Sequence, residues 1–241
     1  MAGYKETPRQ KMIAMMYLVL TALLALNVSV EILEAFVVVN NSIVTTNDNL
    51  KEKINETYAR FEQQNLLNES KVGPYWDNAK RARELSEELI NFIENAKNEV
   101  IAKNEGITIE EAKTIPLGQI ESRDKYDVST NYFIGNSQDG SKGKAREIKN
   151  KIEQFKTDML ALVPENTRGS IKVGLNTTGP FEDAGGKQQN WEMHNFYHMI
   201  LAANVTFLNK LIADVRNLES DVVRNLFNAI SADDYKFDQV A

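Results

Sequence analysis

The sequence predicts an all-α protein, in which one N-terminal transmembrane helix continues into an antiparallel helical bundle. Residues 12–30 carry no charge and are almost entirely apolar. Downstream, apolar residues recur every three or four positions over several long segments, as in helices with one buried face. Stretches that contain glycine and proline separate these segments. The 241 residues suffice for one sizeable domain or two small ones.

The uncharged N-terminal run has the length of a membrane-spanning helix. At 1.5 Å per residue it extends roughly 28 Å, close to the thickness of the hydrocarbon core of a bilayer. A cleaved signal peptide, the alternative, has a shorter apolar centre and a small-x-small cleavage site, and no good Ala-x-Ala site follows here. We therefore predict a retained transmembrane helix over residues 12–35.

The flanking charges predict how this helix is oriented. Lys5, Arg9 and Lys11 precede the span, whereas Glu31 and Glu34 follow it. Basic residues stay on the cytoplasmic side of a membrane. Residues 1–11 are thus expected in the cytoplasm and residues 36–230 in the periplasm, as the helical-bundle domain of a single-pass protein of the bacterial inner membrane. Residues 231–241 are expected to begin a linker to further domains.

The start of the first helix is specified by its sequence. Thr7 can cap it, Pro8 suits the first turn, and Gln10 stands at the position of a capping box. Arg9 therefore lies inside the helix. Asn27 follows Arg9 by five whole turns, so the two share a face. A helix-packing stripe is predicted along this face, formed by Met16, Leu20, Leu23 and Asn27.

Tyr17 lies on an adjacent face, roughly 12 Å along the axis from Arg9. Taken separately, Arg9 could extend to the lipid headgroups and Tyr17 could be an interfacial aromatic residue. A polar stripe is costly on a helix that faces lipid alone, but it serves well against other helices. Arg9 and Tyr17 are therefore predicted to contact a ring of partner helices, with Arg9 in a charge pair.

No acidic residue lies between Lys11 and Glu31. If the protein belongs to an ion-driven machine, it cannot carry the proton in mid-membrane itself. A partner must then supply the carboxylate, for which Arg9 is the natural counter-charge.

Four long helices are expected, which predicts the antiparallel bundle. The first continues unbroken to about Leu66, and the second begins after Pro74 and ends at Gly106. The others cover residues 144–163 and 190–230. In the last helix, Trp191, Asn204, Phe207 and Leu211 are predicted to pack within the bundle or a homodimer, where Asn204 would fix the register.

The remaining segments are expected to be short or irregular. A capped helix is predicted from Thr108, and residues 115–143 are expected to be mostly loop, with a short strand over residues 126–135. Residues 171–176 are either a strand or an extended loop.

Composition excludes several classes of function. The chain has no cysteine, which excludes disulfides and thiolate metal sites, and its net charge of −6 argues against nucleic acid. His194 and His198 have a zinc-like spacing, but no third ligand is obvious, so packing or capping is favoured. No nucleophile–base set or phosphate-binding glycine loop is present. We expect no enzyme, no metal and no cofactor.

Two blocks resemble the GldM/PorM family. The opening "TPRQKMIAMMYLVLTALLALNVS" is similar to the start of the family, with Arg9, Tyr17 and Asn27 in register. The block "NWEMHNFYHMILAANVTFLNKLIADVRNLE" resembles its second recognisable segment, with matches at Trp191, Phe196, His198, Ala202, Leu208, Leu211 and Asp214. Family members are longer and carry β-rich domains after the helical one, so the chain is expected to be a shortened member.

The resemblance implies a subunit of the proton-motive-force-driven motor for type IX secretion and gliding in Bacteroidota. A pair of GldM helices would lie inside a pentameric ring of a multi-pass partner, GldL, with Arg9 paired to its carboxylates and Tyr17 along the contact. The dimeric periplasmic part would pass motion to the outer-membrane GldK/GldN ring through further domains. The alternatives are a membrane-anchored periplasmic sensor and an inert scaffold anchored in the lipid bilayer.

Overall fold

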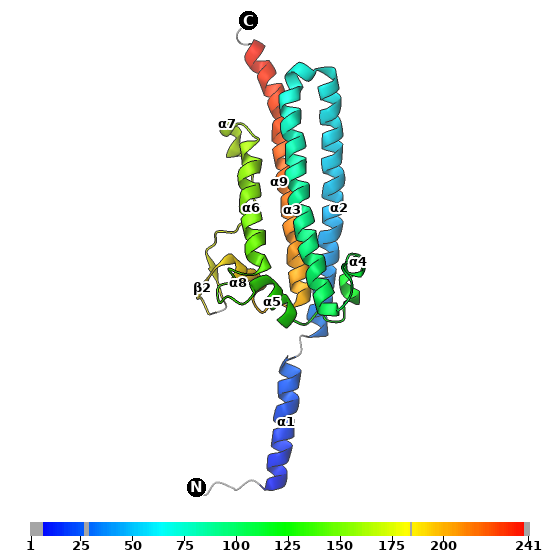
Figure 1. Cartoon of the computed structure of the whole chain (residues 1–241), viewed down its shortest axis with the longest axis vertical. Helices are drawn as coiled ribbons and strands as arrows, with labels where there is room; N and C mark the ends of the chain where they lie inside the picture. The colour runs from blue at the N-terminus through cyan, green and yellow to red at the C-terminus, as the bar shows by residue number, and fades with distance from the viewer. Residues whose placement is uncertain (1–6, 27–28, 184, 239–241) are drawn as a thin grey trace.

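The computed structural model describes residues 7–26, 29–183 and 185–238. Four long helices form the body: α2 (Val30–Leu67), α3 (Glu69–Glu105), α6 (Lys144–Ala161) and α9 (Leu201–Asp238). Helix α1 (Pro8–Leu26) projects beyond one end of this body (Figure 1). The short elements are α4 (Ile109–Ala112), the 3-10 turn η1 (Leu117–Gln119), α5 (Asp127–Ile134), α7 (Glu165–Arg168), α8 (Trp191–Phe196) and the hairpin β1 (Phe181–Glu182) and β2 (Gln188–Gln189).

The prediction of one unbroken helix from Pro8 to Leu66 is wrong. Helix α1 ends at Leu26 and α2 begins at Val30, after a Ser29 whose ψ of 139° is not helical. Glu31 in the first turn of α2 favours a new helix start, because acidic groups stabilise a helix N-terminus. The predicted transmembrane helix over residues 12–35 is thus divided between two helices. Over the described ranges, none of the helices combines the length and the apolar character needed to cross a membrane.

The bundle is only partly antiparallel, which corrects a second prediction. Asn47 of α2 contacts Asn209 of α9, and Tyr58 of α2 contacts Glu219 of α9, so these two helices run in the same direction. Helix α6 also runs this way, and α3 alone runs against the other three (Figure 1). The segment between α7 and α8 returns along the bundle before α9 begins. One long crossover of this kind replaces a short turn in some four-helix bundles.

The strand predicted over residues 126–135 is wrong, because Asp127–Ile134 form helix α5. Ser129 and Phe133, four residues apart, are fully buried, and Ile134 is also buried. The Phe133 ring stacks on Phe196 of α8, with ring centroids 4.4 Å apart. The aromatic and β-branched content suggested a strand, but burial follows the helical period. Residues 171–176 belong to no strand, so the loop alternative holds for them.

The last predicted helix, over residues 190–230, is broken into α8 and α9. His198 has a φ of 53° between them. The first backbone N–H groups of α9 are satisfied from another segment, since Leu201 donates to the Lys125 carbonyl at 2.8 Å and Ala202 to the Arg123 carbonyl at 2.9 Å. This tertiary support makes a new helix start possible at Leu201.

Helix α3 begins before Pro74 and contains it. The Asn68 side chain caps α3 by accepting from the Lys71 N–H at 3.3 Å. Pro74 is the sixth residue of α3, where a proline removes one i→i−4 hydrogen bond and crowds the carbonyl of residue i−4, so the first turns of α3 form despite this local cost. The predicted start of this helix after Pro74 is therefore wrong, whereas its end at Gly106, with φ 72°, is confirmed.

One hydrophobic core joins all four long helices. Aromatic side chains contribute much of its buried area, and Phe61 of α2 packs against Trp76 of α3 and Phe227 of α9. The largest fully buried side chains are Phe61, Ile93, Ile120, Phe133, Ile148, Ile152, Met159, Leu175, Phe196, Leu201, Leu208 and Leu218.

A polar layer crosses the seam of α2, α3 and α9. The Asn209 amide donates to Asn40 Oδ1 at 2.8 Å, and the Asn47 amide donates to the Asn209 carbonyl at 3.0 Å. Lys97 of α3 donates to Asn209 Oδ1 at 2.9 Å. All three asparagines are buried. Because a buried amide is costly without partners, these contacts fix the register of the three helices.

A second buried polar cluster lies farther along the same seam. The Tyr58 hydroxyl is 3.0 Å from the Ala79 carbonyl and 3.1 Å from Glu219 Oε1, and the Arg83 guanidinium lies 3.8 Å from the centre of the Tyr58 ring. Burial raises the pKa of the Glu219 carboxyl to about 7. A protonated Glu219 can donate to Tyr58 while Tyr58 donates to Ala79, so each hydroxyl has its own acceptor.

The close approach of α5 and α6 at Gly143 gives a testable prediction. A Cβ on Gly143 would lie 1.9 Å from the Phe133 carbonyl oxygen. Gly143→Ala must therefore move one helix, and we expect the free energy of unfolding to fall by about 3 kcal/mol in guanidinium denaturation. Gly169→Ala is the control, because its Cβ would meet nothing within 4 Å. Equal stability of the two variants would contradict this packing.

The raised pKa of Glu219 predicts how stability depends on pH. The folded chain binds this proton more tightly than the unfolded chain, whose Glu219 has the ordinary pKa of 4.5. Stability should therefore decrease as pH rises from about 4.5 to about 7, by up to about 3 kcal/mol. Glu219→Gln should remove this part of the dependence and be more stable than the wild type at about pH 8.

The control for this series is Glu52→Gln, which neutralises an exposed carboxylate on α2. The measurement is chemical denaturation of each variant from about pH 4 to about pH 8. This pH range spans the pKa of Glu219 in the unfolded chain and its pKa in the folded chain. If Glu219→Gln followed the wild-type pH profile throughout, the buried carboxyl would not have the environment described.

Candidate partner-binding surface

Helix α1 begins at the predicted capping box. The Thr7 N–H donates to Gln10 Oε1 at 3.0 Å, and the Gln10 N–H approaches Thr7 Oγ1 at 3.4 Å. These reciprocal contacts satisfy backbone donors that a helix start leaves free. The prediction that Arg9 lies within the helix is confirmed.

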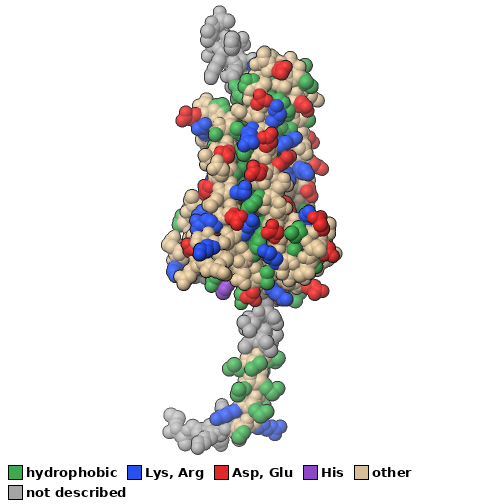
Figure 2. Space-filling view, in the orientation of Figure 1, with side chains coloured by type: hydrophobic (Ala, Val, Ile, Leu, Met, Phe, Trp, Pro, Cys, Tyr) green, Lys and Arg blue, Asp and Glu red, His purple; other side chains and the backbone are tan. Residues whose placement is uncertain are grey.

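The apolar side chains of α1 that the structure describes, from Met12 to Leu20, are exposed on all sides of the helix, as Figure 2 shows for the face in view. Their exposed fractions range from 55% to 72% for Met12, Ile13, Met15, Met16, Tyr17, Leu18, Val19 and Leu20. No described side chain of α1 belongs to the hydrophobic core. A contiguous apolar surface of this kind marks a site that another molecule covers.

The predicted contact residues lie on two faces of α1. Arg9, Met16 and Leu20 are exposed and follow one stripe of the helix. Tyr17, with 72% of its surface exposed, lies on the neighbouring face. The side chain of Leu23 and residue Asn27, also predicted for the stripe, lie outside what the structure describes.

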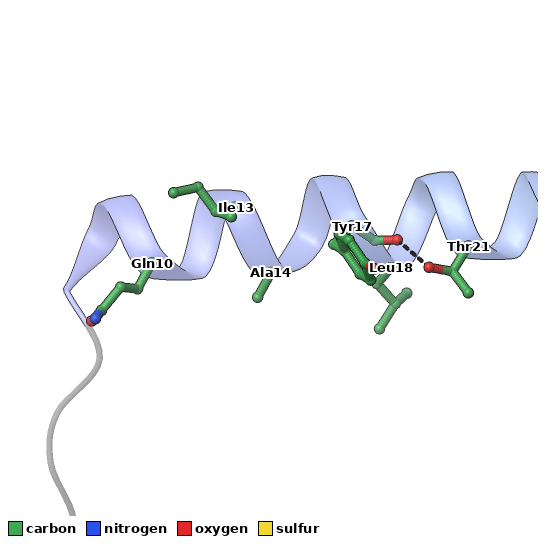
Figure 3. A pocket seen from close by; sticks show the side chains of 6 residues that line it. All are labelled: Gln10, Ile13, Ala14, Tyr17, Leu18 and Thr21. Carbon is green, nitrogen blue, oxygen red and sulfur yellow. Dashed lines mark hydrogen bonds between the residues drawn. The ribbon is translucent and has the colours of Figure 1, made fainter.

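A shallow groove occupies the Tyr17 face of α1 (Figure 3). Gln10, Ile13, Ala14, Tyr17, Leu18 and Thr21 line it. The Thr21 hydroxyl donates to the Tyr17 carbonyl at 2.6 Å, so it needs no partner from another molecule. Small residues such as Ala14 allow a second helix to approach closely. The face is therefore suited to packing against an apolar helix.

The residues predicted for bundle or dimer packing lie inside this chain. Trp191 and Leu211 are buried, and the Trp191 ring lies 6.1 Å from the half-buried Phe207 ring. Asn204 is fully buried, and its amide donates to the Met199 carbonyl at 2.9 Å. These side chains thus contact the interior of one subunit.

His194 and His198 do not share a helical face, because α8 ends between them at Phe196. His194 stacks on Phe181, and His198 packs between Tyr126 and Tyr197. Within the described ranges, no cluster of three or more His, Cys, Asp or Glu side chains could hold a metal ion.

Sequence reasoning missed the two polar clusters in the seam of α2, α3 and α9. Asn40 and Asn47 continue the seven-residue spacing of the buried Leu33 and Ile54, and Asn209 and Glu219 directly follow the buried Leu208 and Leu218. A polar residue on the buried face of an amphipathic helix was the available signal. Its partners come from other helices and have no local signature.

The comparisons with known proteins identify a family. A family model described as the GldM N-terminal domain matches residues 31–229, from the first turn of α2 into α9. No curated protein was found to match the chain. The matched region is the helical body, which comprises most of the chain and includes both polar clusters. The family indicated by the sequence resemblance is therefore confirmed, and the chain belongs to the GldM N-terminal domain family.

Proposed function

We propose that the chain is a non-enzymatic component of the type IX secretion and gliding machinery, acting at the inner membrane of a bacterium. It would couple ion flow in a multi-pass GldL-like ring to motion of a periplasmic shaft. Membership in the GldM N-terminal domain family supports this assignment. The geometry of α1 supports the more specific role.

The observation that carries the proposal is the exposure, on every side, of the apolar side chains described on α1, from Met12 to Leu20. Burying one large apolar side chain stabilises a complex by about 1.5–3 kcal/mol, so covering α1 is strongly favourable. Apolar helices of a multi-pass partner would supply this cover, with Tyr17 and its groove along the contact. The bundle would then lie on the periplasmic side.

Arg9 would link this contact to proton flow. It lies in the first turn of α1, at the edge of the apolar surface, and no carboxylate is within 4.0 Å of it in the described part of the chain. A partner carboxylate would pair with Arg9 when ionised and release it when protonated. Each proton transfer would thus change the preferred position of α1 relative to the ring.

The bundle would transmit this motion. Helix α2 begins near α1. Helix α9 runs parallel to α2 and ends at the opposite end of the body (Figure 1). The asparagine layer and the Tyr58–Glu219 contact tie these two helices at two levels. A force applied at the start of α2 would therefore reach the far end of α9. Two copies in a pentameric ring, and a GldK/GldN ring beyond further domains, would complete the assembly.

Replacing Arg9 tests this function against an inert anchor. We expect Arg9→Ala to co-purify with the multi-pass partner in detergent but to lower secretion and gliding at least tenfold in cells, because the charge pair is lost. Arg9→Lys should retain part of the activity, since it keeps the charge but not the bidentate geometry.

Lys11→Ala is the matched control, because Lys11 carries the same charge on the opposite side of the same helix turn. It should keep nearly full activity. Wild-type secretion and gliding with Arg9→Ala would refute charge pairing and favour a scaffold or sensor anchored by α1.

A further inference from the structure

A polar cavity lies between α2, α3 and α9, away from the α1 surface. Its volume is about 220 Å³. Since a water molecule occupies about 30 Å³ in the liquid, this is room for about seven waters or a small hydrated ion. The lining residues are Lys51, Ile54, Asn55, Arg83, Glu87, Ile90, Asn91, Arg216 and Glu219.

Each of the three helices contributes one cation to the cavity: Lys51 from α2, Arg83 from α3 and Arg216 from α9. Cations that balance nearby acids normally form ion pairs with them. Here no carboxylate oxygen lies within 4.0 Å of any of the three, as far as the described residues extend. Glu87 and Glu219 are therefore not their direct partners, although both line the cavity.

The two arginines are prepared for a ligand in different ways. Arg83 is held over the Tyr58 ring and donates to Asn55 Oδ1 at 2.9 Å, so its position is fixed and its other donors remain available. Arg216 has a buried Nε with no hydrogen-bond partner. A buried guanidinium donor without an acceptor is costly, and an oxyanion would satisfy it.

Glu219 determines the balance of charge in the cavity. It is buried beside the cations, and its hydrogen bond goes to Tyr58, while Arg83 and Arg216 act on its carboxyl through space without a direct ion pair. When Glu219 is neutral, the three cations face only Glu87, which is exposed to solvent. The cavity then carries a clear positive excess, which favours an anion of compact shape and more than one negative charge.

We propose that this cavity binds a compact free oxyanion such as inorganic phosphate, held by Lys51, Arg83 and Arg216, and that protonation of Glu219 strengthens binding. The site would tie α2, α3 and α9 together at the level of the second polar cluster. This inference does not depend on the proposed motor function.

The test is calorimetric titration of the full chain in detergent with inorganic phosphate. Phosphate replaces chloride in the buffer, so that the ionic strength stays constant. We expect saturable binding and a rise in Tm with phosphate concentration. Arg216→Gln and Lys51→Gln should each weaken phosphate binding about tenfold, the effect of one charged hydrogen bond.

Arg81→Gln is the matched control, because Arg81 is exposed on α3 and paired with Glu84 outside the cavity. It should bind phosphate like the wild type. Loss of binding in Arg81→Gln as large as in Arg216→Gln would mean that only net charge matters and would overturn the site, as would the absence of saturable heat in the wild type.

A second titration with sulfate tests the role of Glu219, because sulfate keeps its charge between about pH 6 and about pH 8. Wild-type binding should be several-fold tighter at the lower pH, and Glu219→Gln should bind equally at both. The groups that face Glu219 are Tyr58 and Lys51 on α2, Arg83 and Glu87 on α3, and Arg216 on α9. Sulfate affinity independent of pH in the wild type would contradict the link to Glu219.

Discussion

The Asn209 amide is the contact on which the arrangement of the bundle most depends. It is buried on α9, and it reaches Asn40 on α2 and Lys97 on α3 at once, while its backbone carbonyl accepts from Asn47. A buried amide that lost these partners would cost as much as several apolar contacts gain. Sliding α9 by one turn would break all of them together. The layer therefore selects one register among those that apolar packing alone would tolerate, and it holds α9 parallel to α2.

Helix α1 has the opposite physical character. Its first turn is capped by Thr7 and Gln10, but its apolar side chains have no cover in the described part of the chain. The bundle buries its apolar faces within one chain, whereas α1 leaves its own surface for another molecule. Because the break near Ser29 separates the two parts, covering α1 need not disturb the core. A partner can thus bind α1 while the register set by Asn209 stays intact.

Local signals made part of this structure predictable. The pairs Thr7–Gln10 and Thr108–Glu111 marked helix starts, and apolar periodicity indicated α3 and α6, because caps and periodicity depend on neighbours in sequence. The break before Leu201, the helix α5 and the parallel course of α9 were not predictable, since partners distant in sequence stabilise them. The break at Ser29 was missed because the apolar pattern continues across it. On α1, Arg9 and Tyr17 were identifiable because one helix positions both. Lys51, Arg83 and Arg216 each resemble ordinary surface charge until three helices bring them to one cavity.

The anion cavity and the asparagine layer lie on the same seam, which relates ligand binding to mechanics. Asn47 and Tyr58 are 11 residues apart, so their contacts with α9 are about 16 Å apart along the helix axis. Two contacts at this separation, Asn47 with Asn209 and Tyr58 with Glu219, resist rotation of α2 against α9 more strongly than either contact alone. An oxyanion between Lys51, Arg83 and Arg216 would add a third tie that also includes α3. Occupancy of the cavity would then stiffen the path from the start of α2 to the end of α9, because separating these helices would also require release of the ion.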